Sequence, residues 1–400
     1  MTIPDGQTDP TPPLRRGDTD LASWRTSPHS RWAFHHVREL VPSAVISAGD
    51  TAPFGPAQPA AAALDAAIPE AEQTLTDTET TGLVVLHRGR LAHEDYRLGY
   101  SGQAPHIVFS ISKSVSGLLT GILAAEGALS VDDLVTRWVP EAAGSAYDGA
   151  TLRHLLDMTV STGFEESYLD TTGDYVRYRE ATAWNPIAGG RAPSDLRSFL
   201  AGLRPSPEPH GGPMHYVSPN SDMLGWVLER ASGRPYAELC SDLLWRPLGA
   251  EAAAEVTVDR FGAPRSAGGI SMRPRDLARL GEMMRLGGQG PRGPVVPEAW
   301  VAGICAHDGD TEGRASWVAG DMRELFPDGS YRAQWYRSGH PSGAFAAVGI
   351  HGQWLWVDPT AEVVIAKASA QTLPIDDALD QRTIALFVRI CAWLSGASGS

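Results

Sequence analysis

Ser110 and Lys113 are the residues of this sequence whose types and spacing most clearly indicate chemistry. Of the 33 lysines and arginines in the chain only two are lysines, and one of them, Lys113, follows Ser110 by three residues. Arginine stays protonated and cannot exchange a proton, whereas a shielded lysine can lose one. A Ser-x-x-Lys pair at the start of a helix is typical of serine acyl transferases that lack a Ser-His-Asp triad.

The residues after Ser110 predict the helix that this pair requires. Apolar side chains recur at three- and four-residue steps as far as Leu123, and Gly127 follows as a helix stop. Ser110 would then lie at the helix N-terminus, where free N–H groups and the macrodipole favour negative charge on a reacting oxygen. Lys113 would lie one turn further on the same face, and burial would allow it to act as a neutral base.

Two later segments could complete a catalytic site. Tyr216 and Ser218 directly precede a predicted helix, and a tyrosine hydroxyl beside a lysine can relay protons. In the segment 349–353, Gly-Ile-His-Gly-Gln, glycines flank an apparent edge strand and would let a substrate reach backbone N–H groups. Taken singly, each pattern has an ordinary alternative: a packed loop tyrosine for the first and a β-bulge for the second.

The elements that must position these residues come from both ends of the chain. An apolar run at 83–86, a turn at 88–90 and the segment 91–96 predict a hairpin. A period close to two predicts strands over 346–350, 354–357 and 363–366. Helices are predicted over 151–158, 221–231 with Ser221 as N-cap, 274–286 and 377–394. This order predicts an α+β fold in which strands from the N- and C-terminal segments form one antiparallel sheet with flanking helices. We predict a flexible tail over 1–20, an α/β domain over 21–145 and 290–400, and a mostly helical inserted domain over 146–289.

Composition narrows the classes of partner and compartment. The formal net charge of −14 argues against nucleic-acid or anionic-membrane binding, which require clustered positive charge. The three cysteines, Cys240, Cys305 and Cys391, are widely spaced and match no metal motif, as in proteins of a reducing compartment. With no run of eighteen apolar residues, we expect a cytoplasmic protein that acts on a small molecule. The oligomeric state is open, and a homodimer is among the states allowed.

Two other enzyme classes fit less well. The segment 288–293 matches the dinucleotide-binding pattern Gly-x-Gly-x-x-Gly, but it follows a predicted helix and contains Pro291, so we interpret it as a loop. No Gly-x-Ser-x-Gly segment occurs, which removes the usual α/β-hydrolase alternative.

The order of the three segments resembles a known family, the penicillin-recognising serine hydrolases related to class C β-lactamases. Longer matches make the chain similar to one branch, the 6-aminohexanoate-dimer hydrolases or nylon-oligomer hydrolases, over nearly all of its length from about residue 20. They are Ser23-Trp24, Pro28 to Phe34, Gly144 to Gly149, Leu155 to Met158, Asp276 to Arg279 and Ile350 to Gln353.

The resemblance implies a β-lactamase/DD-peptidase-like fold and a role for each matched residue. Ser110 would be the acylated nucleophile, with Lys113 and Tyr216 sharing the proton transfers. The backbone N–H groups of Ser110 and Ile350 would form the oxyanion hole, and Tyr168 would cover the substrate. Neither a metal nor a cofactor would be required.

At several positions this sequence differs from its relatives, and these differences affect which substrates we expect it to cleave. Ser218 stands where many relatives carry asparagine, Ala267 where efficient ones are often polar, and Arg179 lies in the segment where an acidic group for the substrate ammonium is expected. We expect these residues and His351 to contact substrate. The segment 351–353 replaces the Lys-Thr-Gly motif of β-lactamases, so cephalosporin hydrolysis should be weak. Because Arg179 and Ala267 argue against efficient hydrolysis of the amide dimer, and an ester has the better leaving group, we expect ester hydrolysis.

The main hypothesis is therefore a serine hydrolase, with amidase or carboxylesterase activity, that forms an acyl-enzyme on short linear amides or esters. One alternative is a β-lactamase or D-amino-acid peptidase. Another is a non-catalytic binding or sensor module that becomes acylated without turnover.

Overall fold

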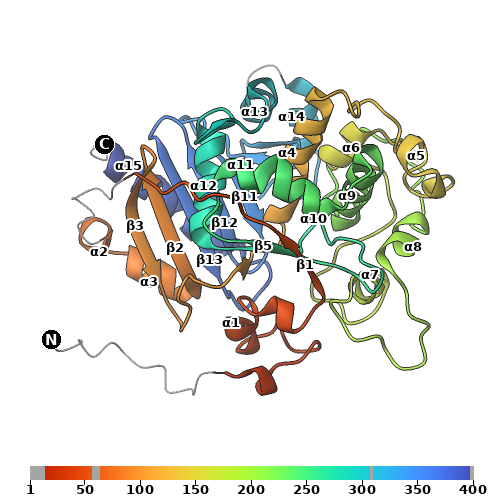
Figure 1. Ribbon diagram of the computed structural model, residues 1–400, viewed down its shortest axis with the longest axis horizontal. Coiled ribbons are helices and arrows are strands. Elements are labelled where there is room, and N and C mark those ends of the chain that lie inside the picture. The colour runs from red at the N-terminus through yellow and green to blue at the C-terminus, as the bar shows by residue number, and fades with distance from the viewer. Residues whose placement is uncertain (1–13, 56–63, 307–309, 397–400) are drawn as a thin grey trace.

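A seven-stranded antiparallel sheet forms the centre of the fold (Figure 1). The computed structural model describes residues 14–55, 64–306 and 310–396. The strand order is β3-β2-β13-β12-β11-β10-β9, so strands from both ends of the chain meet where β2 pairs with β13. The bounds are β2 Thr80–His87, β3 Arg90–Tyr96, β9 Ser330–Arg332, β10 Trp335–Arg337, β11 Phe345–Gly349, β12 Gln353–Asp358 and β13 Val363–Ser369.

Both faces of this sheet are covered by helices. Leu83 and Val85 of β2 point to one face, where α3 (Ala71–Asp77) and α15 (Asp377–Ser395) pack, and Val84 and Leu86 point to the other. There α12 (Pro274–Arg285) lies across β2, β12 and β13, and α4 (Ile111–Ala125) lies against β11 and β12. Since both faces are buried, these strands are apolar along their whole length rather than alternating.

A second sheet of four short strands leads the chain to the nucleophile. Its order is β1-β5-β6-β4, with bounds Ser43–Ile46, Ala254–Thr257, Ile270–Met272 and His106–Ile107. The N–H of Val108 donates to the Ile270 carbonyl at 2.9 Å, which carries the pairing on from β4 towards Ser110. The segment 288–293, predicted as a loop, overlaps the two-residue strands β7 (Gln289–Gly290) and β8 (Gly293–Pro294).

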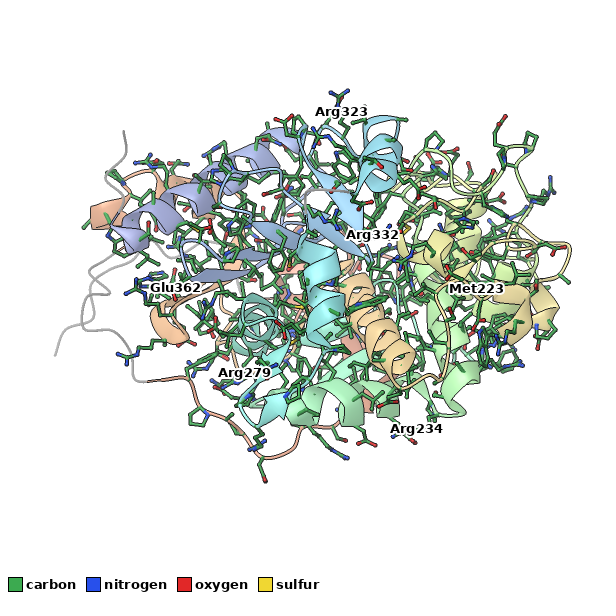
Figure 2. The ribbon with its side chains drawn as sticks, turned by 90° about the horizontal axis from the view of Figure 1, so that it is seen from above. Met223, Arg234, Arg279, Arg323, Arg332 and Glu362 are labelled. Atoms are coloured by element: carbon green, nitrogen blue, oxygen red, sulfur yellow. The ribbon has the colours of Figure 1, made fainter. Side chains whose placement is uncertain are left out.

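The remaining helices gather mainly beyond α4, on the side away from β3 (Figure 1). In the view from above, Glu362 of the β12–β13 turn and Met223 of α9 lie towards opposite sides of the molecule (Figure 2). The bounds are α1 His29–Ala33, α2 Leu64–Ala67, α5 Val135–Trp138, α6 Leu152–Leu156, α7 Asp174–Ala181, α8 Leu196–Ala201, α9 Ser218–Ser232, α10 Tyr236–Leu239, α11 Arg246–Leu248, α13 Glu298–Cys305 and α14 Thr311–Val318. Short 3-10 turns occupy Arg16–Asp18, Val37–Glu39 and Pro140–Ala142, and a π-turn occupies Cys240–Trp245.

The structure confirms the predicted α+β fold class, the hairpin, the C-terminal strands and the helices α4, α12 and α15 to within a few residues. Two local predictions were wrong. Ser221 is not an N-cap, because α9 begins at Ser218 with a proline in its first turn, and the buried Ser221 hydroxyl donates to Gln334 at 2.5 Å. The strand before Ile350 is not an edge strand, because β10 and β9 extend the sheet beyond β11.

The domain division stays a prediction. Helix α12 belongs by sequence to the segment 146–289 and packs on the central sheet. Of the predicted tail, residues 1–13 lie outside the described residues. Among the helices that the structure describes, none is both long and apolar enough to cross a membrane.

Candidate active site

The amine of Lys113 lies at the centre of the candidate site. It donates to the Ser110 hydroxyl at 2.7 Å, to the Ser218 hydroxyl at 3.0 Å and to the Ala267 carbonyl at 2.8 Å. The side chain is 1% exposed, and burial lowers its pKa to about 7, with Arg265 acting in the same direction and the carboxylates of Glu166 and Asp222 opposing. Near neutral pH this amine can therefore both accept and return a proton.

A strained backbone turn presents Ser110 to this amine. Phe109 has φ of +43°, in the left-handed region that a bulky aromatic residue rarely adopts. Its buried ring packs against Trp24, Phe34 and Trp184, and these contacts hold the turn. Helix α4 begins at Ile111, so Ser110 lies at its N-terminus and Lys113 lies one turn further along the helix.

Tyr216 covers the other side of the amine. The Lys113 Nζ atom lies 4.9 Å from the centre of the tyrosine ring. Burial raises the pKa of Tyr216 above its usual value, although the side chains of Ser110 and Tyr336 both act to lower it, so the hydroxyl is protonated at neutral pH. The backbone N–H of Tyr216 donates to the Asp321 carboxylate at 3.2 Å, which anchors the segment before α9.

Glu166 is a residue of the site that the sequence analysis did not single out. Its carboxylate accepts hydrogen bonds from the Ser218 hydroxyl at 2.7 Å and from the Ser218 backbone N–H. Burial raises the pKa of the Tyr168 hydroxyl, and the nearby Glu166 carboxylate raises it further. The carboxylate thus lies one hydroxyl away from Lys113, where its negative charge favours the protonated amine.

Ala267 holds the amine through its backbone rather than its side chain. The methyl group is fully buried, while the N–H donates to the Asp222 carboxylate at 2.7 Å. Asp222 is itself held by a buried ion pair with Arg265 at 2.5 Å and by the Tyr178 hydroxyl at 2.5 Å. This network orients the carbonyl that accepts from Lys113, and no sequence pattern pointed to it.

The end of β11 lies directly against the nucleophile. A Cβ atom on Gly349 would lie 2.4 Å from the Val108 carbonyl oxygen and 3.1 Å from the Ser110 nitrogen, so only glycine allows this approach. In the described residues neither Ser110 nor Ile350 donates its backbone N–H to another backbone group. Both residues line the same cavity, where two such N–H groups could receive an oxyanion.

The cavity in front of Ser110 has a volume of about 230 Å³ and is also lined by Tyr168 and Tyr216. Its wall contains four carboxylate side chains and, among the described residues, no lysine or arginine. The carboxylates belong to Asp321, Glu324, Asp377 and Asp380. The cavity therefore favours neutral or cationic substrate groups over anionic ones.

Four of the five predicted substrate contacts, Ser218, Arg179, Ala267 and His351, are not among the residues that line this cavity. His351 is buried against Phe34 and Phe109, and its Nδ1 atom bonds the Gln371 carbonyl at 2.7 Å. Burial lowers the pKa of His351 to about 4, so the ring is neutral. Arg179 donates to the Asp170 carbonyl at 2.6 Å and lies over the Tyr175 ring.

Comparisons with known proteins identify the family to which the chain belongs. The Beta-lactamase family model matches residues 68–389. The chain is 38% identical to the 6-aminohexanoate-dimer hydrolase of Paenarthrobacter ureafaciens over 361 residues, 90% of each chain. It is 32% identical to Esterase EstB of Burkholderia gladioli over 170 residues, 39% of this chain and 40% of that one. Among solved structures, a Bacillus anthracis protein assigned to the 6-aminohexanoate-dimer hydrolases superposes with a TM-score of 0.85 at 23% identity, covering 97% of this chain and 100% of that one.

Proposed function

We propose that this chain, which belongs to the β-lactamase family and to its 6-aminohexanoate-dimer hydrolase branch, hydrolyses short linear amides or esters through an acyl-enzyme on Ser110. Family membership makes it a serine hydrolase of amides or esters, and the residue roles are our proposal. The observation that supports them best is the buried Lys113 amine, 2.7 Å from the Ser110 hydroxyl and with a pKa of about 7.

In the first half of the reaction, neutral Lys113 takes the Ser110 proton as the serine oxygen attacks the substrate carbonyl carbon. The N–H groups of Ser110 and Ile350 stabilise the resulting oxyanion. The proton then passes from the Lys113 ammonium, through the Tyr216 hydroxyl, to the leaving amine or alkoxide, which departs and leaves an ester on Ser110. Glu166 stabilises the transient ammonium through its negative charge.

In the second half, water replaces the leaving group. Lys113 takes a proton from the water as its oxygen attacks the acyl carbon, the ester bond breaks, and Ser110 regains its proton. Tyr168 lines the cavity beside these groups and would cover the substrate. Ser218 would hold the amine between the two halves of the reaction, since it accepts from Lys113 and donates to Glu166.

Esters are the substrates that we expect to react fastest. An alkoxide needs less protonation than an amide nitrogen to leave, so ester cleavage depends less on the relay through Tyr216. We do not propose β-lactam cleavage as the main activity, because penicillins and cephalosporins carry a carboxylate and four carboxylate side chains line the cavity.

Steady-state assays separate this proposal from its alternatives. The native chain should hydrolyse p-nitrophenyl butyrate with many turnovers, and a chromogenic cephalosporin far more slowly. Ser110→Ala should lose the esterase activity while keeping its fold. Faster turnover of the cephalosporin would instead support a β-lactamase, and a single stoichiometric burst without further product would support a sensor module.

For partners and location, we propose a small-molecule substrate and the cytoplasm. Neither nucleic acid nor a membrane is expected as a partner, given the net charge of −14. The three cysteines are unpaired, as is usual in a reducing compartment. We include a homodimer among the proposed assemblies, and sedimentation equilibrium would measure the mass of the assembly in solution.

A further inference from the structure

The chain's second lysine, Lys367, is buried close to the candidate oxyanion hole. It lies on β13 and is 0% exposed. Its Nζ atom donates to the Gly352 carbonyl at 3.2 Å and to the Ser369 hydroxyl at 2.5 Å. Burying an amine costs free energy, and an apolar side chain at this position of the sheet would avoid that cost. The presence of a lysine here therefore needs a physical reason.

The explanation lies in the turn that the amine contacts. Residues 350–352 connect β11 to β12. His351 and Gly352 have φ of +60° and +78°, in the left-handed region that residues other than glycine rarely adopt. A Cβ on Gly352 would lie 3.1 Å from the Ser369 Cβ, which shows how closely β13 lies behind the turn. Ile350, whose N–H faces the nucleophile in the proposed mechanism, is the first residue of this turn.

Other contacts secure the turn at different points. Gln353 donates from its side chain to the His351 carbonyl at 2.9 Å and to the Ser369 carbonyl at 2.7 Å. The His351 N–H donates to the Pro374 carbonyl at 2.9 Å. Within the described hydrogen bonds, the Gly352 carbonyl has a single side-chain donor, which is Lys367.

We propose that Lys367 is a positioning residue that fixes the 350–352 turn, and with it the Ile350 N–H, by donating to the Gly352 carbonyl. The inference rests on the proposed function, because it assigns the Ile350 N–H to the oxyanion hole. Lys367 touches neither substrate nor Ser110. Burial lowers the pKa of Lys367 to about 7, and the Asp380 carboxyl group of α15, which lines the cavity, opposes this shift. Burial also raises the pKa of Asp380 to about 7.

Replacement of Lys367 by methionine tests the proposal, because methionine fills the space without a donor. A misplaced oxyanion donor weakens binding of the transition state more than binding of the substrate. Lys367→Met should therefore lower kcat for p-nitrophenyl butyrate by about 10- to 100-fold with little change in KM. Affinity for a phenylboronic acid, which forms a tetrahedral adduct with an active serine, should fall by a similar factor.

Ile365→Ala is the matched control. Ile365 lies two residues earlier on β13, is fully buried and points to the same face of the sheet. It pairs with Trp356 of β12, whereas Lys367 pairs with Trp354, two residues nearer the turn. It should lower the melting temperature and leave kcat and boronate affinity close to the native values. If Lys367→Met behaves like this control, the proposal is wrong and the lysine serves stability alone.

Two further measurements keep the test decisive. Should Lys367→Met fail to fold, Ser369→Ala removes the amine's second partner but leaves its bond to the Gly352 carbonyl. The kcat and boronate affinity of Ser369→Ala should therefore stay within a few-fold of native, and a loss as large as that expected of Lys367→Met would overturn the assignment to the Gly352 bond. Ser110→Ala is assayed in parallel. Activity retained in Ser110→Ala would refute the proposed function itself, whereas an inactive Ser110→Ala beside a fully active Lys367→Met would refute only the role of Lys367.

Discussion

Replacement of Lys113 by arginine separates its role as a base from its role as a charge. With a pKa of about 7, roughly three-quarters of the Lys113 side chains are neutral at pH 7.5. An arginine with an ordinary pKa of about 12.5 would be neutral in only about one molecule in 10⁵ at that pH. Since a positioned general base contributes about 10²- to 10⁴-fold, Lys113→Arg should lose at least about 100-fold in kcat/KM.

The assay is release of p-nitrophenol from p-nitrophenyl butyrate, with folding followed by circular dichroism and thermal melting. Lys113→Met tests the same point without the added bulk of arginine, and it should be similarly inactive. Thr120→Ser is the control, because Thr120 is buried in the same helix and bonds only the Ser116 carbonyl. Esterase activity within a few-fold of native in a folded Lys113→Arg variant would refute the assignment of Lys113 as the base.

Three further outcomes follow from the same geometry. The kcat/KM of the native enzyme should rise with pH through about 7, as Lys113 loses its proton, and a flat profile between pH 5.5 and 8 would contradict this. Glu166→Gln should move that rise to lower pH, because the carboxylate raises the pKa of Lys113; an unchanged midpoint would show that Glu166 does not act on the amine. Gly349→Ala should reduce kcat/KM about 100-fold or destabilise the fold, because the added methyl group meets the Val108 carbonyl and the Ser110 N–H, and native rates with a native melting temperature would contradict that packing.

The parts of the site that are local in sequence could be predicted from it. Ser110 and Lys113 share one helix, so the helical period alone places them on one face. The β2–β3 hairpin was equally accessible, because a short apolar run followed by a tight turn is a local signal. The rarity of lysine in this chain added the expectation that Lys113 is shielded, and the structure agrees with it.

The parts that depend on long-range contacts could not be predicted. Glu166 reaches Lys113 only through Ser218, 52 residues away, and nothing in its own sequence context distinguishes it from the neighbouring Glu165. The Ala267 carbonyl is an acceptor by virtue of its backbone, which a residue type does not reveal. The strand β11 was assigned to an edge because β9 and β10 are three residues long, too short for a clear alternating pattern.

Intact-protein mass spectrometry after brief exposure to p-nitrophenyl butyrate tests the central claim most directly. One butyryl group should be present per native chain, on the peptide that contains Ser110, and it should disappear within the turnover time once the ester is exhausted. Ser110→Ala should remain unlabelled. A butyryl group on Ser110→Ala, or rapid turnover by that variant, would contradict the account.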